Sequence, residues 1–184
     1  MGKNYVAIHY IQDRMKSFSP KFVDCVVRCF SYAEQIKADR DCLSNTIALF
    51  ICAKEYGYNP QICYGLCVLD NREFYHAWLK INDIVIDIAI YGNVNYNPLS
   101  PWSFTLETPY IGTYEDAPVH YGEFVFDEDW PMCEISKMQH CPIEKYMDNA
   151  PQDGMWRVVC KYLDITFSKQ KIKELTKYIE NIYI

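Results

Sequence analysis

The sequence has no apolar run that approaches the length needed to cross a membrane, which is about 20 residues. Its first residues, MGKNYVAIHYIQDR, lack an apolar core followed by a small-residue cleavage site. Val6 stands where a myristoylation motif needs a hydroxyl group. These absences predict a protein without a secretion signal or a membrane anchor, and we expect it to be cytoplasmic.

A surplus of positive charge is also missing, because 18 Lys and Arg residues face 24 Asp and Glu residues, for a formal net charge of −6. Binding to phosphate backbones or anionic lipid usually depends on a broad positive field. We therefore expect neither nucleic acid nor a membrane as a partner. Half of the 184 residues are hydrophobic. With no repeats, low-complexity tracts or clear linker, the chain predicts a single domain over residues 1–184.

Cysteine, by contrast, is abundant, with nine residues. Without a secretion signal we expect these thiols to be reduced and mostly buried as small apolar side chains. A structural zinc site is an alternative, with Cys25 and Cys29, Cys63 and Cys67, and Cys133 with His140 and Cys141 as the available ligands. None of these sets has the spacing of a zinc knuckle, so we expect no metal and no other cofactor.

The spacing of apolar residues predicts a mixed α+β fold. The predicted elements are a short strand at 5–11, a helix at 20–37, a second helix ending at Gly57, strands at 61–69, 74–81 and 84–90, a strand within 119–126, a helix near 152–161 and a terminal helix from Ser168. The terminal helix is expected to turn Ile172, Leu175, Ile179 and Ile182 inward. The order of these elements predicts an antiparallel sheet packed against helices.

The second helix is predicted to begin at Asp39 or Asp41, whose carboxylate would accept hydrogen bonds from the first-turn amides. Cys42 then lies in the first turn, where the positive end of the helix dipole lowers a thiol pKa. A nearby imidazolium would lower it further. The backbone N–H of Cys42 would also be free to stabilise an oxyanion, since first-turn amides have no helical partner.

The stretch FYHAWLKINDIVIDIAIYG places a histidine and an aspartate in two apolar strands. A two-residue loop at Asn82-Asp83 would pair residue 81 with 84, leaving His76 opposite Ala89 and Asp87 on the same face as His76. A carboxylate there would fix the tautomer of the imidazole and favour its charged form. A four-residue loop at 70–73 would in turn place Cys67 opposite His76, and small side chains on that face would let the Cys42 helix approach.

The segments DCLSNTIALFICAKEYGYNPQICYG and HAWLKINDIVIDIA resemble the core of the transglutaminase-like superfamily of papain-like cysteine enzymes. Within that group the pattern is most similar to small bacterial transglutaminase-like proteins, including the leader peptidases of lasso-peptide biosynthesis. Arylamine N-acetyltransferases use the same order of residues. The resemblance covers roughly residues 39–92, and it departs from many relatives at Leu43, where animal transglutaminases carry tryptophan, and after Asp87.

The resemblance implies a Cys-His-Asp triad in which Cys42 attacks an amide or thioester carbonyl, His76 protonates the leaving group and Asp87 orients the imidazole. Gln35 is the residue that would supply a side-chain oxyanion donor in a papain-like enzyme. The expected substrate is a peptide or protein, and peptidase, amidase, transglutaminase and acetyltransferase activities all share this first step. The competing interpretation is a catalytically silent binding module, with the aromatic residues of 91–130 as its partner surface.

Overall fold

The computed structural model describes residues 3–39, 41–123, 142–149 and 154–182. The helices are α1 (Lys3–Arg14), α2 (Pro20–Ile36), α3 (Cys42–Glu55), α4 (Ala89–Asn95), α6 (Ile143–Asn149), α7 (Met155–Leu163) and α8 (Lys169–Thr176). The strands are β1 (Pro60–Leu69), β2 (Arg72–Ile81), β3 (Ile84–Asp87), β4 (Tyr110–Gly112) and β5 (His120–Glu123). They form an antiparallel sheet of order β4-β3-β2-β1-β5, which confirms the α+β fold class.

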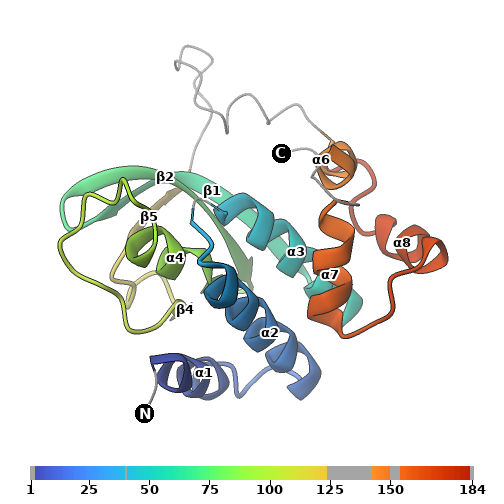
Figure 1. Cartoon of the computed structure of the whole chain (residues 1–184), viewed down its shortest axis with the longest axis horizontal. Coiled ribbons are helices and arrows are strands. Elements are labelled where there is room, and N and C mark those ends of the chain that lie inside the picture. The colour runs from blue at the N-terminus through green and yellow to red at the C-terminus, as the bar shows by residue number, and fades with distance from the viewer. Residues whose placement is uncertain (1–2, 40, 124–141, 150–153, 183–184) are drawn as a thin grey trace.

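Helix α3 lies between the sheet and helix α7, with α2 alongside it (Figure 1). Its packing face meets Ala77, Leu79 and Ile86 of the sheet in the larger apolar core. The opposite face of the sheet belongs to a second core around Trp78, which contains Cys63 and Cys67. Those small side chains therefore do not lie under α3, and the predicted reason for their size is wrong. No helix in the described ranges is long and apolar enough to cross a membrane.

Helices α2 and α3 begin close to the predicted positions. The Ser19 hydroxyl accepts the N–H of Phe22 at 3.4 Å and caps α2, as the Ser-Pro sequence predicted. Helix α3 begins at Cys42, but the side chain of Asp41 makes no capping hydrogen bond, so of the two predicted caps Asp41 is wrong. Gly57 follows α3 with a positive φ of 82°, a conformation that glycine adopts without strain.

The predicted strand at residues 5–11 is wrong, because this segment lies within α1. Its fully buried residues are Ala7 and Ile11, and Met15, directly after α1, continues this spacing of four positions, which places the three on one face of a helix. That face packs against α2. The β-branched and aromatic residues of the segment favoured a strand, but the spacing of the side chains that are buried is helical.

The β2–β3 hairpin has the predicted register, with Ile81 paired to Ile84 and Leu79 to Ile86. The β1–β2 register was predicted wrongly. Asp70 and Asn71 both have positive φ, 51° and 59°, and form a two-residue turn of the kind that joins antiparallel strands tightly. Gly65 rather than Cys67 is therefore the residue opposite His76.

Strand β3 is shorter than predicted, because it ends at Asp87 and α4 begins at Ala89. The Asp87 carboxylate accepts the N–H of Ile90 at 3.0 Å, which satisfies an amide in the first turn of α4. His76 consequently has no strand partner at Ala89. The carboxylate that was predicted to sit within a strand instead marks the change from strand to helix.

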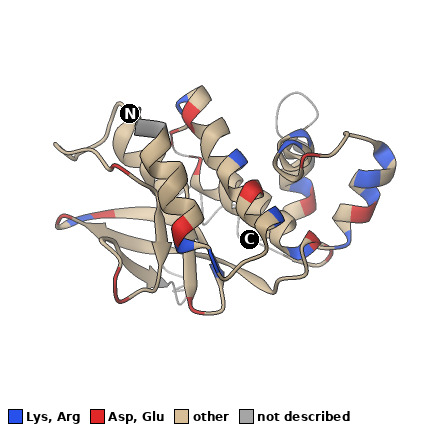
Figure 2. Cartoon of the chain, turned by 90° about the horizontal axis from the view of Figure 1, so that it is seen from below, with Lys and Arg blue, Asp and Glu red and all other residues tan. Residues whose placement is uncertain are grey.

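The last part of the chain adds α7, which overlaps the helix predicted near 152–161, and α8, which is shorter than the predicted terminal helix. Of the four residues expected to face inward, Leu175 and Ile179 are buried, whereas Ile172 and Ile182 are half-buried. Lysines line the outer face of α8, which is visible as a blue edge in Figure 2. Strand β5 falls within the strand predicted at 119–126.

Candidate active site

Cys42 is the first residue of α3, and its side chain is only 9% exposed. The thiol forms hydrogen bonds with the side chain of His76 and with the backbone of Ala77, both in β2. The early end of β3 explains how α3 reaches this strand. By the hairpin register Ala77 would pair with residue 88, but β3 stops at Asp87, so the backbone of Ala77 is left open toward the start of α3.

His76 and Asp87 form the buried pair that the hairpin predicted. Nε2 of His76 lies 2.8 Å from Oδ2 of Asp87, and the two side chains are 0% and 1% exposed. A carboxylate accepts hydrogen bonds, so Nε2 carries a proton and donates it to Asp87. Nδ1 is then the ring nitrogen that meets the thiol of Cys42.

Asp87 is held in place by donors from three elements. Besides His76, Oδ2 accepts the hydroxyl proton of Tyr121 at 2.8 Å, and Oδ1 accepts the N–H of Ile90. Tyr121 lies in β5, which pairs with β1 at the edge of the sheet. These three donors satisfy the oxygens of a side chain that is almost fully buried.

Asn93 of α4 was not predicted, yet it contacts the same imidazole. Its side-chain nitrogen lies 3.2 Å from Nδ1 of His76, and the residue is buried. Because the segment after Asp87 has the alternating pattern of a continuing strand, no local pattern indicates that position 93 lies beside position 76. Both ring nitrogens of His76 therefore have a side-chain partner.

The charges of the cluster shift the pKa of both groups toward a thiolate and an imidazolium. Burial alone lowers the pKa of His76, but the charge and hydrogen bond of Asp87 outweigh it and raise the pKa to about 10. Burial alone raises the pKa of the Cys42 thiol, yet the hydrogen bond and charge of His76 bring it below its ordinary value. This is the electrostatic condition for an activated cysteine.

With this geometry established, known families were compared with the chain. Residues 12–100 match the family model described as the transglutaminase-like superfamily. These residues form a transglutaminase-like core. The match confirms the family predicted from the DCLSNT and HAW segments, whereas the finer resemblance to lasso-peptide leader peptidases stays a prediction. Comparison with curated proteins and with solved structures found no match.

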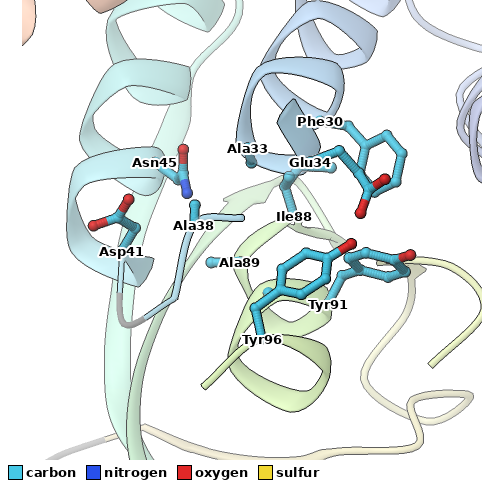
Figure 3. A pocket seen from close by; sticks show the side chains of 11 residues that line it. Phe30, Ala33, Glu34, Ala38, Asp41, Asn45, Ile88, Ala89, Tyr91 and Tyr96 are labelled. Atoms are coloured by element: carbon cyan, nitrogen blue, oxygen red, sulfur yellow. The ribbon is translucent and has the colours of Figure 1, made fainter. Parts of the chain in front are cut away.

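Cys42, His76 and Asp87 form one cluster in the transglutaminase-like core, and none of the contacts described above involves Gln35. Gln35 is exposed on the last turn of α2. Its neighbour Glu34 points instead into a cavity of about 10 Å³ (Figure 3), which is room for roughly one water molecule. The oxyanion roles of Gln35 and of the backbone N–H of Cys42 therefore both stay predictions.

Helix α6 also reaches the first turn of α3 in the transglutaminase-like core. The hydroxyl groups of Ser44 and Tyr146 lie 2.6 Å apart. Burial raises the pKa of Tyr146, and the charges of Asp41 and Cys42 add to this effect, which places its phenol near the nucleophile. This contact joins residues 102 positions apart in the sequence, and no local pattern indicated it.

The alternative zinc ligands lie apart from this site or outside the described residues. Cys25 and Cys29 are buried in the larger core, and Cys63 and Cys67 in the smaller one. The set Cys133, His140 and Cys141 falls outside the residues that the structure describes. The seven cysteines within them are free thiols and all buried. In the same residues, no group of three or more His, Cys, Asp or Glu side chains is arranged to hold a metal ion.

The Cys42–His76 pair has two opposite effects on the pH dependence of stability. The raised pKa of His76 adds stability that is complete below pH 6.5 and is lost as pH rises toward about 10. The lowered pKa of Cys42 adds stability that is present above pH 9.0 and is lost as pH falls. Where the folded pair is a thiolate and an imidazolium between these limits, it holds one proton, on His76, and the unfolded chain also holds one, on Cys42, so the two effects on the pH dependence cancel.

Replacing Cys42 by alanine should remove this cancellation. We expect the free energy of unfolding of Cys42→Ala to fall relative to wild type between about pH 7 and pH 9, by up to about 1.4 kcal/mol per pH unit. Urea unfolding of both proteins across this pH range measures the difference between their free energies of unfolding. All other groups titrate in both proteins, so their contribution is removed when the two profiles are subtracted. Parallel pH profiles would show that no ion pair forms.

Proposed function

We propose that this chain is a thiol-dependent acyl-transfer enzyme that acts on a peptide or amide bond through Cys42, His76 and Asp87. The observation that carries the proposal is the position of His76, which bonds Asp87 through Nε2 and also contacts the thiol of Cys42. The transglutaminase-like core supports it, because cysteine enzymes of papain-like fold are built on this arrangement.

In the first half of the reaction, the Cys42 thiolate attacks the carbonyl carbon and the carbonyl π electrons move onto oxygen. The resulting oxyanion accepts the backbone N–H of Cys42 at the start of α3. The proton on Nδ1 of His76 passes to the departing amine as the carbon–nitrogen bond breaks. The products are a free amine and a thioester between the acyl group and Cys42.

In the second half, water or an amine attacks the thioester carbonyl while Nδ1 of His76 removes its proton. The carbon–sulfur bond breaks and its electrons return to sulfur, which restores the thiolate and the imidazolium. Hydrolysis and transamidation differ only in which nucleophile enters at this step. The role of Asp87 is the same in both, since it keeps the proton of Nε2 in place and Nδ1 available.

The decisive experiment is intact-mass trapping of the acyl-enzyme. We incubate the full chain with a panel of electrophilic peptides and thioesters, and expect wild type to gain the mass of one acyl group while Cys42→Ala gains none. The matched control is Cys160→Ala, which removes a buried thiol of α7 whose pKa is affected by burial and by Lys171, and it should leave the adduct unchanged. Equal adducts on wild type and Cys42→Ala would refute the mechanism, and wild type without any adduct would favour a silent binding module.

A further inference from the structure

The amide of Asn93 and the thiol of Cys42 compete for one atom of His76. Nδ2 of Asn93 lies 3.2 Å from Nδ1, and Nδ1 is the nitrogen left for the thiol once Nε2 donates to Asp87. An unprotonated Nδ1 has a single lone pair, so it accepts fully from only one donor. An amide N–H there stabilises the neutral ring, whereas transfer of the thiol proton to Nδ1 displaces that N–H.

We propose that Asn93 is a positioning residue that restrains charge separation in the proposed enzyme, because its amide N–H beside Nδ1 of His76 favours the neutral ring and so weakens, without reversing, the ion pair that Asp87 favours. Asn93 and Asp87 then have opposite effects on one ring, because Asp87 favours the imidazolium through Nε2 and Asn93 favours the neutral form through Nδ1. This inference rests on the proposed function, since it assigns Asn93 a part in activating the same thiol.

Burial makes this competition effective. Asn93, His76 and Asp87 are all buried, so water does not take over the role of a removed donor. Asn93 belongs to α4, whose first turn is tied to Asp87 through the Ile90 amide. The two side chains that oppose each other on His76 are therefore positioned by one short segment of chain.

Several other titratable groups surround the pair. Asp87 of β3 accepts the hydroxyl of Tyr121 of β5 on Oδ2, the same oxygen that faces Nε2 of His76. Cys67 of β1 lies close enough to Asp87 and Cys42 to sense their charges. Asp41 and Tyr146 lie beside Cys42 on the α3 side. A substitution at Asn93 leaves all of these titratable groups in place.

The test is the pH profile of iodoacetamide alkylation at Cys42, followed on its own peptide by mass spectrometry, in wild type and Asn93→Leu. Leucine has a similar size and no hydrogen-bond donor. We expect the apparent pKa of the Cys42 thiol to fall by about one unit, so that alkylation at acid pH becomes roughly tenfold faster. A residue with only a structural role would not give a gain in reactivity.

The matched control is Asn95→Leu in the same helix. Asn95 bonds the backbone of Leu106 through both atoms of its amide, at 2.8 and 2.9 Å, so its loss should destabilise the fold and leave the Cys42 profile unchanged. If Asn93→Leu does not fold, Asn93→Ala provides the same test. An unchanged or higher apparent pKa in a folded Asn93 variant would overturn the inference.

The two proposals fail in different ways. If wild-type Cys42 is alkylated at acid pH no faster than the other thiols and forms no acyl adduct, the proposed function itself is wrong. If wild type is reactive and a folded Asn93 variant is not more reactive, only the role of Asn93 is wrong. The wild-type profile separates these outcomes before any variant is compared.

Discussion

Asp87→Asn should lower the rate at which an activated peptide acylates Cys42 by about a thousandfold, because the wrong imidazole tautomer then faces the thiol. Three donors converge on Asp87, from His76, Tyr121 and Ile90. An amide has one acceptor oxygen, and its NH₂ group would face at least one of these donors. When it faces Nε2, the proton of the neutral ring moves to Nδ1, and His76 no longer accepts the proton of Cys42.

The same substitution removes the main cause of the raised pKa of His76, which is the charge of Asp87. Cys42 then loses the imidazolium that lowers its own pKa. A thiol with an ordinary pKa of about 8.5 is only about 0.3% thiolate at pH 6. The rate of iodoacetamide alkylation of Cys42 at that pH should therefore also fall sharply. Acylation and alkylation together distinguish loss of the base from loss of the thiolate.

Tyr121→Phe is the graded control for Asp87→Asn. It removes one donor from Oδ2 and leaves the carboxylate, the His76 contact and the Ile90 amide intact. We expect acylation to change far less than in Asp87→Asn, by less than about tenfold, since one neutral hydrogen bond contributes about 1 kcal/mol. If the Asp87→Asn protein folds and the activated peptide acylates its Cys42 at a rate close to that of wild type, the proposed role of Asp87 is wrong.

The parts of the site that the sequence predicted are those set by short-range rules. A two-residue turn at Asn82-Asp83 fixes the hairpin register, and the alternation of side chains then places Asp87 on the face of His76. The helix signals before Cys42 likewise placed this residue in the first turn of α3. The catalytic roles of these residues stay predictions that the trapping experiment tests.

The parts that were missed depend on contacts between segments far apart in the chain. Tyr121 reaches Asp87 from 34 positions away, through the pairing of β5 with β1. Asn93 was missed because IVIDIAI alternates like a strand beyond Asp87, whereas tertiary contacts and the capping carboxylate turn the chain into α4. Composition and periodicity contain no information about which distant side chain completes a buried hydrogen-bond network.

The close approach of α4 to the segment before Cys42 gives the second large prediction, which concerns stability. A Cβ added to Gly92 would lie 2.2 Å from the backbone oxygen of Ala38. Gly92 and Ala38 also line the cavity in Figure 3, at the contact between α4 and the chain that leads into α3. Neither backbone can relieve this overlap by a change of side-chain rotamer, so α4 and this segment must move apart.

Gly92→Ala should therefore lower the free energy of unfolding by about 3 kcal/mol, the cost of a tight overlap between backbone segments. This cost must exceed the roughly 1 kcal/mol by which alanine is favoured over glycine inside a helix. Urea unfolding measures the loss. We also expect slower alkylation of Cys42 at pH 6, because the displaced segment ends four residues before Cys42 and α4 carries the Ile90 amide that is bonded to Asp87.

Gly112→Ala is the matched control, because it also creates an overlap but with a different neighbour. Its Cβ would lie 2.7 Å from the hydroxyl of Tyr110, the far end of a side chain that can move. We expect a loss below about 1 kcal/mol there and no change at Cys42. A Gly92→Ala protein as stable as wild type would mean that α4 can shift away from Ala38 without cost, and the site would then not depend on their contact.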